Sequence, residues 1–214
     1  MLKIARPTCA SIMEQPPVIR LIDSDVRPLA ETMARAFLQG PNFVYTQPDE
    51  ARRRQTLPAM FSCFIRIGQQ VGTVYTTDER NGAAIWAAPG RHAGFIDSWR
   101  AGFLALPLRL RFSAVVRLGQ LGTHLSSKRR ALMPEPHWYL MALAVDPYQQ
   151  GKGLGSHLIR PVLTQADRAG QACYLETFVR QNLHFYEKHG FQTLGKCTLP
   201  NGGPTYWTMK RLST

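Results

Sequence analysis

Residues 143–155 read LAVDPYQQGKGLG, in which the apolar end of an expected strand runs into a glycine-rich loop. Gly151, Gly153 and Gly155 leave out the side chains that would block a phosphate, and successive backbone N–H groups can point into one concavity. The loop is followed by an expected helix, whose first N–H groups are unpaired and carry about half a positive charge. This arrangement predicts an anion-binding site.

The spacing of the glycines excludes two common phosphate-binding motifs. The loop lacks the Gly-Lys-Ser/Thr ending of a P-loop and the Gly-x-Gly-x-x-Gly spacing of dinucleotide-binding folds. The remaining pattern, from Gln150 to Gly155, is Gln-x-x-Gly-x-Gly. Because glycines between a strand and a helix also occur in purely structural turns, the neighbouring elements have to decide the function.

Hydrophobic periodicity predicts alternating strands and helices on both sides of the loop. Before the loop we expect a strand at 18–22, two helices beginning near Val26 and Pro48, a hairpin of strands at 71–77 and 83–88, a helical region at 98–126 divided at Pro107, and a central strand at 138–145. After the loop we expect a helix to about Ala169, a strand at 172–178, a helix at 182–189, and strands at 191–199 and 205–210. Within 98–126 the expected inward side chains are Leu108, Phe112, Val115 and Leu118, and the expected outward ones are Arg109, Ser113 and Arg117.

The composition is that of a folded protein, with 214 residues of which 44% are apolar and 19% charged. Lys and Arg outnumber Asp and Glu by 26 to 14, and this excess favours a polyanionic partner such as nucleic acid, an anionic lipid surface or a phosphate-bearing cofactor. The four cysteines form no CxxC pair, so we expect free thiols and no metal site. No apolar run approaches the roughly 18 residues of a membrane helix, and we expect a cytoplasmic location.

A second motif lies downstream, where residues 182–191 read NLHFYEKHGF. Together with 143–155, it resembles the acetyl-CoA signature and the Asn-x-x-x-Tyr-x-x-x-Gly-Phe segment of the GNAT superfamily of N-acetyltransferases. The resemblance implies an α/β (α+β) fold of one domain over 18–214, with a mixed, mostly antiparallel twisted sheet that is splayed at its centre and has helices on both faces. Residues 1–17 are expected to form a flexible N-terminal extension.

The same resemblance implies acetyl-CoA as the cofactor, with CoA as the product. The residues implied to bind it are Leu143, Ala144, Val145, Gln150, Gly151, Lys152, Gly153, Leu154, Gly155, Ser156 and Asn182. An amine would attack the thioester directly, without an acyl-enzyme. Backbone N–H groups near Leu143 would stabilise the developing oxyanion, and Tyr186 would be the general acid that protonates the departing thiolate. Asn182 and Tyr186 are four residues apart and would share a helix face, although Tyr186 could instead simply pack in the core.

A closer resemblance, over residues 18–211, is to the puromycin N-acetyltransferase group. It is carried by Trp138, residues 175–177, the second motif and Pro161. A proline such as Pro161 costs roughly 3 kcal/mol in an ordinary helix interior, so its presence supports kinship. Gly40 and residues 42–45 depart from that group, which puts puromycin itself in doubt as the acceptor.

The need for a catalytic base depends on the acceptor. At pH 7, an amine with a pKa near 8 costs about 1 kcal/mol to deprotonate, and a lysine-like amine with a pKa near 10.4 costs about 4.6 kcal/mol. Glu176 could act through water or position the acceptor, or its carboxylate could point into solvent. His137 and Glu135 are weaker candidates for the base. Cys173 has no evident base partner and lies in a strand-like run, so we expect it to be buried and not to act as a nucleophile.

The acceptor is expected to be a small-molecule amine. Phe37, Phe43, Tyr45 and the basic helices within 95–130 would frame its site. The alternatives are a lysine or N-terminus of a protein, which an open groove would favour, and a non-catalytic module that binds CoA or nucleic acid. Because no recognised nucleic-acid motif accompanies the basic residues, we expect neither a nucleic-acid nor a membrane partner, and a homodimer is left open.

Overall fold

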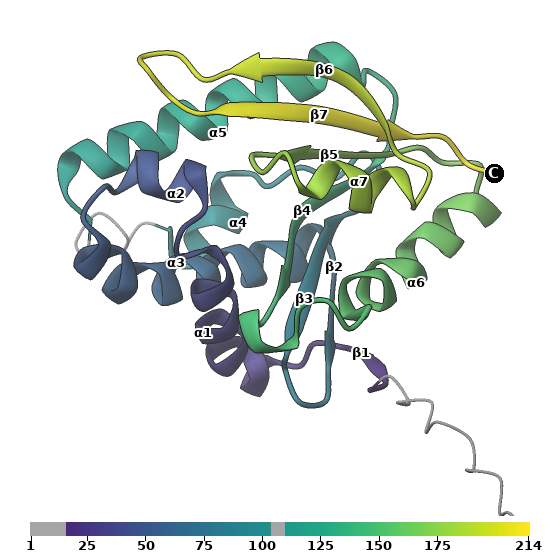
Figure 1. Cartoon of the computed structure of the whole chain (residues 1–214), viewed down its shortest axis with the longest axis horizontal. Coiled ribbons are helices and arrows are strands. Elements are labelled where there is room, and N and C mark those ends of the chain that lie inside the picture. The colour runs from purple at the N-terminus through teal and green to yellow at the C-terminus, as the bar shows by residue number, and fades with distance from the viewer. Residues whose placement is uncertain (1–15, 104–109) are drawn as a thin grey trace, which may run out of the picture.

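The structure is a computed structural model that describes residues 16–103 and 110–214. It contains one seven-stranded sheet in the order β1-β2-β3-β4-β5-β7-β6 (Figure 1). The strands are β1 Val18–Arg20, β2 Gly72–Thr77, β3 Gly82–Ala87, β4 Trp138–Val145, β5 Cys173–Thr177, β6 Gln192–Thr198 and β7 Thr205–Arg211. The helices are α1 Val26–Phe37, α2 Pro41–Thr46, α3 Glu50–Val71, α4 Phe95–Arg100, α5 Phe112–Leu132, α6 Leu154–Arg168 and α7 Asn182–Glu187. No helix in these two ranges is long and apolar enough to cross a membrane.

The centre of the sheet is splayed between β4 and β5. These are the one parallel pair among the strands described, and their pairing joins only Trp138–Leu140 to Cys173–Leu175. At Met141, the register between β3 and β4 shifts opposite the Ile85–Trp86 step. A β-bulge of this kind bends the strand that carries it. β4 and β5 therefore separate beyond Leu140, as predicted (Figure 1).

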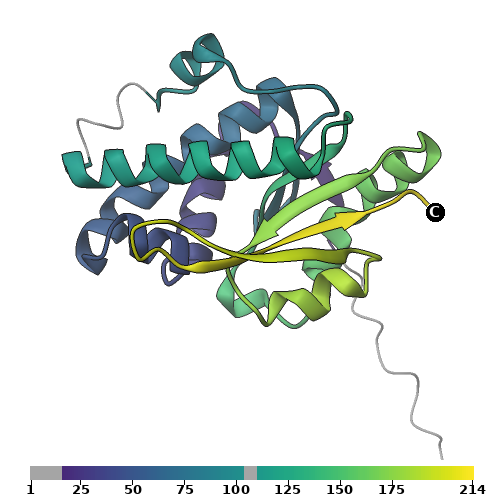
Figure 2. The same ribbon diagram turned by 90° about the horizontal axis from the view of Figure 1, so that it is seen from above.

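Helices cover both faces of the sheet, and the residues of β3 explain why. Ala83 and Ile85 pack in the core that contains α1 and α3, whereas Ala84 and Trp86 pack in the core that contains α6. Successive side chains of a strand point to opposite faces, so a strand between two cores is apolar throughout. The mixed α/β, mostly antiparallel fold with helices on both faces is thus confirmed (Figures 1 and 2).

Helix α5 lies across the end of the molecule that carries the last hairpin (Figure 2). Leu121 of α5 packs in one cluster with Leu199, which follows β6, and Tyr206, which belongs to β7. The turn of the hairpin contains Asn201 and Gly202 with φ of 57° and 72°. Both residues have the left-handed conformation that two-residue hairpin turns require, and the predicted hairpin is confirmed.

Two local predictions are wrong. Two helices were expected between the first strand and the hairpin, but a third, the short α2, starts at Pro41, because Gly40-Pro41 not only ends α1 but also begins a helix with proline at its first position. Phe112 was expected to face inward and is 83% exposed. It lies two residues from the buried Ala114, which is roughly 200° around a helix, so the two side chains point to different sides.

The expected division at Pro107, with Leu108 and Arg109, lies outside the described residues. On the described part of α5, Val115 and Leu118 pack partly buried against the core, as predicted. Arg117, expected to face outward, is half-buried because it donates a hydrogen bond to the Tyr45 carbonyl oxygen at 2.9 Å.

Candidate active site

The separation of β4 and β5 opens onto a pocket of about 480 Å³. Its strand walls are formed by residues 139–143 of β4 and 175–177 of β5, and Asn182 and Tyr186 of α7 line it from the side. Helices α1, α2, α3 and α5 supply most of the remaining, largely apolar lining, and Ala87 of β3, residues 91–93, Phe103 and residues 178–179 supply the rest. As their four-residue spacing predicts, Asn182 and Tyr186 face the same space.

The glycine loop has the backbone conformation that an anion site needs. Gly151 and Gly153 have φ of 78° and 82°, in the left-handed region that favours glycine. A Cβ atom added at Gly151 would meet nothing within 4 Å, so the space beside this backbone is open. Gly153 caps α6 and offers no side chain, which leaves the N–H groups of the first turn without a side-chain acceptor. This loop fits a pyrophosphate.

Direct contacts join the loop to the second motif. A Cβ atom added at Gly155 would lie 3.3 Å from Cζ of Phe185, so α6 and α7 approach closely at this glycine. At the next residue, the Ser156 hydroxyl forms a hydrogen bond of 2.9 Å with Nε2 of His189, which lies four residues after Phe185. The two motifs, about thirty residues apart in the sequence, are therefore in direct contact in the fold.

The other residues expected to bind the cofactor lie along the end of β4 and the loop. Leu143 lines the pocket, and Ala144 is buried in the core beside α1. The Val145 carbonyl oxygen accepts a hydrogen bond from Gln150 Nε2 at 3.1 Å. Beyond Leu140, this part of β4 has no β5 residue paired with it.

Two loop residues have specific surroundings. Lys152 is exposed, and its Nζ donates a hydrogen bond to Gln149 Oε1 at 2.9 Å. The Leu154 side chain is buried in the core that contains α6, so only its backbone can take part in binding. The loop therefore presents backbone groups and one cation, Lys152, at its edge.

Tyr186 combines packing with a place in the pocket. It is 7% exposed, and its ring centroid lies 5.1 Å from that of Phe185 and 5.9 Å from that of Phe191. Burial raises the pKa of its hydroxyl well above the ordinary value of 10, so the phenol keeps its proton at neutral pH. The ring does pack in the core, and the same residue also borders the pocket.

Glu176 faces the pocket from β5, on the same side of the strand as Tyr174. Burial raises the pKa of its carboxyl to about 7, and interactions with Tyr139 and Arg129 only partly oppose this. Its Oε1 is buried and has no hydrogen-bond partner among the described residues. The reading of Glu176 as a solvent-pointing carboxylate is therefore wrong, since this face of β5 borders a pocket.

The remaining candidates are separated from the Glu176 and Tyr186 pair. His137 is buried, its Nδ1 lies 2.7 Å from the Glu135 carbonyl oxygen, and burial lowers the pKa of its ring. Both residues border a second, smaller pocket instead. Cys173 is fully buried as predicted, and burial raises the pKa of its thiol to about 12, which leaves no thiolate for attack. In the described ranges no group of three His, Cys, Asp or Glu could hold a metal ion.

The acceptor side of the pocket is aromatic. The ring centroids of Phe37, Phe43 and Phe61 lie 5.2 to 5.5 Å apart, and all three residues line the pocket. Tyr45, expected beside them, instead packs against Arg117, and the guanidinium carbon Cζ lies 5.6 Å from the Tyr45 ring centroid. Residues two apart on a helix point roughly 200° apart, so α2 directs Phe43 inward and Tyr45 elsewhere.

Sequence reasoning missed Tyr139, and it included Arg129 only as one residue of the basic helices within 95–130. Arg129 of α5 lies over the Tyr139 ring with its Cζ 3.9 Å from the centroid, and both residues line the pocket that contains Glu176. Tyr139 lies within the apolar run of β4, so it did not stand out in the sequence. The available signal was the period-two alternation of a strand, which directs Tyr139 to the face opposite its buried neighbours. Arg129 had no local signal, because it is one of many basic residues on α5.

Comparisons with known proteins agree with this geometry. Residues 57–191 match the acetyltransferase (GNAT) family. An uncharacterized N-acetyltransferase of Schizosaccharomyces pombe is 26% identical over 182 residues, which cover 80% of this chain and 72% of that protein. A solved structure described as histone acetyltransferase HPA2 and related acetyltransferase, from Corynebacterium glutamicum, has a TM-score of 0.66 at 21% identity and covers 94% of this chain and 98% of its own.

Arylalkylamine N-acetyltransferase 2 of Aedes aegypti has a TM-score of 0.59 at 13% identity, and 92% of this chain and 99% of that one are covered. At these identities the solved structures show a shared fold. The family match spans most of the chain, including the glycine loop and the segment with Tyr186. The chain therefore belongs to the acetyltransferase (GNAT) family and is an acyltransferase.

Proposed function

We propose that the protein transfers an acetyl group from acetyl-CoA to the amine of a small molecule. The observation that carries this proposal is that Glu176 and Tyr186 line one pocket of about 480 Å³, where β4 and β5 separate. One residue there can take a proton and the other can donate one. The two act on opposite partners of an acyl transfer, the incoming amine and the departing sulfur.

The cofactor half of the site would be held mainly by backbone. Residues 143–145 of β4 would receive the pantetheine arm, and residues 150–156 would receive the pyrophosphate. Asn182 lines the same pocket as Leu143 and Tyr186, where it would contact the arm. Acetyl-CoA, when bound, supplies the acetyl group as an activated thioester.

Glu176 is proposed to accept the proton of the amine. A carboxylate with a pKa of about 7 is partly ionised at neutral pH and is a stronger base than an exposed glutamate. Its unpartnered Oε1 leaves an acceptor for an N–H group inside the pocket. Tyr139, which interacts with the same carboxylate, would hold it in place.

Tyr186 is proposed to act on the departing sulfur. Because burial keeps its phenol protonated, it can donate a hydrogen bond to a thiolate. A thiol has a pKa near 8.5, which is lower than that of the Tyr186 phenol, so complete transfer of the phenolic proton to the thiolate is uphill. This transfer therefore occurs late, unless solvent protonates the thiolate first. The main contribution of Tyr186 is then stabilisation of negative charge.

A small-molecule acceptor is supported by the shape and lining of the site. The pocket is covered by α5 and by the aromatic residues of α1, α2 and α3, whereas a protein acceptor would need an open groove. Solved structures with the same fold include an agmatine N-acetyltransferase and the polyamine N-acetyltransferase of Drosophila melanogaster, each with a TM-score of 0.58. Both names describe enzymes for small amines.

Several finer points stay predictions from the sequence. They are the kinship with the puromycin N-acetyltransferase group, a homodimer, a cytoplasmic location, and the division of the chain at residue 17 into an extension and a catalytic domain.

The proposal is tested by measuring thiol release from acetyl-CoA with a panel of small amines and with a lysine-containing peptide. We expect release to depend on at least one small amine and to fall in Tyr186→Phe. If no amine raises release above background and CoA does not bind, the enzymatic proposal fails. If only the peptide is acetylated, a protein acceptor replaces the small molecule. Full activity of Tyr186→Phe across pH would remove only the role given to Tyr186.

A further inference from the structure

We infer that the acceptor carries an anionic group, a carboxylate or a phosphate, in addition to its amine, and that this group binds in a second pocket beside Arg129. The inference rests on the proposed function, because it assigns the substrate class of the same site. The second pocket has a volume of about 300 Å³ and lies between the segment after β3 and the end of α5. No cofactor or catalytic role has been given to it above.

The second pocket adjoins the first. Six residues line both, namely Ala87, Arg91, His92, Arg129, Arg130 and Tyr139. A ligand that reaches Glu176 in the first pocket can therefore extend into the second. The shared wall is built on Tyr139 of β4, whose ring is covered by the Arg129 guanidinium at 3.9 Å.

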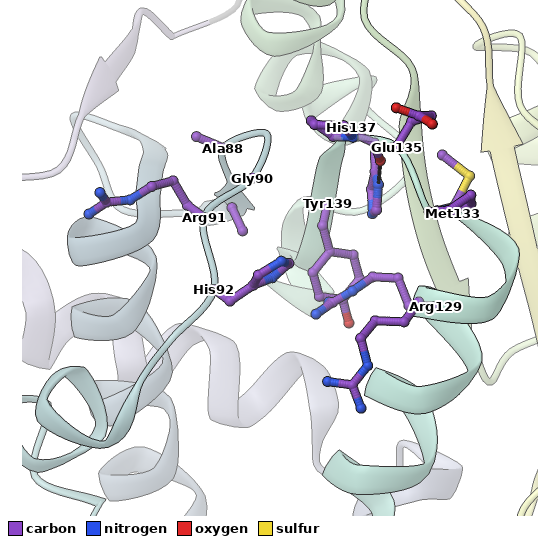
Figure 3. Close-up of a pocket in the computed structure, with 13 residues that line it drawn as sticks. Ala88, Gly90, Arg91, His92, Arg129, Met133, Glu135, His137 and Tyr139 are labelled. Carbon is purple, nitrogen blue, oxygen red and sulfur yellow. Dashed lines mark hydrogen bonds between the residues drawn. The ribbon is translucent and has the colours of Figure 1, made fainter.

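The charges around the second pocket are mostly positive. Three arginines, Arg91, Arg129 and Arg130, line it beside two histidines, and Glu135 is the one acid among its lining residues. In Figure 3, His92 and Arg129 project from opposite sides toward Tyr139, whereas the Glu135 carboxylate points away from them. The Arg129 guanidinium and the His92 ring therefore face the space beside Tyr139.

Arg129 and Arg130 form no direct ion pair in the described part of the chain, where the ion pairs found involve other arginines. The carboxyl that Arg129 acts on is that of Glu176, which faces the first pocket. Stacking on Tyr139 fixes the Arg129 guanidinium without neutralising it. An arginine that is held in place, half-buried and without a directly paired carboxylate is suited to a bidentate contact with a carboxylate or phosphate.

The position of the second pocket excludes the cofactor pyrophosphate as its ligand. Tyr139 stands near the start of β4, whereas the glycine loop follows Val145 at the end of this strand. Six residues of a strand span about 20 Å, so the two anion sites lie at opposite ends of β4. An anion beside Arg129 must then belong to the acceptor.

The distance between the two charges of the acceptor is expected to be short. Arg129 and Glu176 both act on Tyr139, and Arg129 also acts directly on the Glu176 carboxyl. An amine placed at Glu176 and an anion placed at Arg129 are thus separated by little more than the tyrosine side chain. This arrangement fits a compact zwitterion and disfavours a polyamine, whose second cation would meet Arg129.

The test compares matched acceptors. Linear ω-amino carboxylates and ω-aminoalkyl phosphates of two to six carbons would be assayed beside the alkylamines of the same length, with thiol release from acetyl-CoA as the readout. We expect at least one anionic acceptor to have a kcat/KM at least about tenfold above its matched alkylamine, as a charged hydrogen-bonded contact provides. The carboxylate and phosphate series distinguish the two sources of the anion.

Substitutions at Arg129 then locate the contact. In Arg129→Gln, the ratio of kcat/KM between the best anionic acceptor and its alkylamine should fall about tenfold or more, and Arg129→Lys, which keeps the charge, should retain part of this ratio. Arg27→Gln is the control, since the Arg27 side chain is 91% exposed on α1 and pairs with Glu31. Thermal unfolding of each variant verifies that it is folded.

The outcomes separate this inference from the proposed function. Acetylation of alkylamines and diamines without preference for any anionic acceptor would overturn the inference and leave the proposed function intact. An equal loss for anionic and neutral acceptors in Arg129→Gln would also overturn it, because Arg129 would then be structural. If no acceptor of any class is acetylated, the proposed function fails and the inference fails with it.

Discussion

The proposed cofactor half and the proposed acceptor half of the site are built in different ways. The proposed cofactor half consists of backbone: the end of β4, the loop with Gly151 and Gly153 in left-handed conformations, and the N-terminus of α6. The acceptor half consists of side chains from α1, α2, α3, α5 and β5 that converge from distant parts of the sequence. A backbone site recognises one constant ligand, whereas a side-chain site can change its acceptor without disturbing the cofactor.

The two halves also differ in the solvent exposure of their polar and charged groups. The loop residues 150–153 are exposed, and their donors remain accessible to an anion from solvent. Glu176 is half-buried in the other half, with a raised carboxyl pKa and a buried oxygen without a partner. The acceptor half therefore holds a destabilised group for catalysis, and changes there should alter activity and stability in opposite directions.

The largest expected effect follows from replacing the base. Glu176→Gln keeps the shape of the side chain and removes its ability to accept a proton. We expect kcat/KM for the acceptor to fall about 100- to 1,000-fold, as is typical when a general base is lost, while the Kd of CoA stays unchanged. Steady-state kinetics and calorimetric titration with CoA measure the two halves separately.

If Glu176→Gln weakened CoA binding as much as it slowed the reaction, the two halves would not be independent. The wild-type pH profile offers a further control. Activity should rise as the carboxyl ionises around pH 7, and this limb should be absent in the residual activity of the variant.

The difference between the halves also explains what the sequence could predict. A backbone site is formed by contiguous residues, so the loop was found from glycine spacing, and the Asn182–Tyr186 pair from its resemblance to the GNAT superfamily. Most strands and helices followed from hydrophobic periodicity, the splayed sheet was implied by the resemblance, and the parallel pairing of β4 with β5 is a finding of the structure. The acceptor side depends on which side chains meet after folding, and nothing local to Arg129 shows that it will stack on Tyr139. Two of the wrong assignments, those of Tyr45 and Phe112, concern which side of a helix a residue faces.

The next effect concerns stability rather than activity. The folded pKa of Glu176, about 7, lies above its ordinary value of 4.5, so the folded state binds the proton more tightly than the unfolded state. The stability from this proton is fully present below pH 4.5 and is lost as pH rises through 7. Glu176→Gln should therefore be more stable than the wild type at pH 8, by up to about 3 kcal/mol, with little difference near pH 4.

Thermal unfolding at both pH values measures this difference, which corresponds to roughly 5 to 10 °C at pH 8 for a chain of this size. A variant that is less stable than the wild type at pH 8 would show that the carboxylate is stabilised by its neighbours. The site would then lack the trade-off between stability and activity described above.

Tyr186 lies where the two halves meet, and its replacement should have an intermediate effect. Tyr186→Phe keeps the ring that packs against Phe185 and Phe191 and removes only the hydroxyl. Loss of one hydrogen bond to a charged group costs about 1.5 to 3 kcal/mol, so we expect kcat to fall about 10- to 100-fold with little change in either KM. Pre-steady-state thiol release would show the loss in the chemical step. An effect on KM for acetyl-CoA alone would place Tyr186 in the cofactor half.

The smallest expected effect tests the backbone nature of the cofactor half. Gly151→Ala adds a methyl group where φ is 78° and where no atom lies within 4 Å, so the change costs about 1 to 2 kcal/mol of backbone strain without a clash. Gly170→Ala is a matched control, because Gly170 follows α6 with φ of 64° and equally open surroundings. Both variants should lose similar stability, but only Gly151→Ala should raise KM for acetyl-CoA, by about tenfold, since its methyl group enters the space where a phosphate approaches the backbone. If the two variants have the same KM for acetyl-CoA, the pyrophosphate does not bind at this loop, and the cofactor half must be sought among side chains instead.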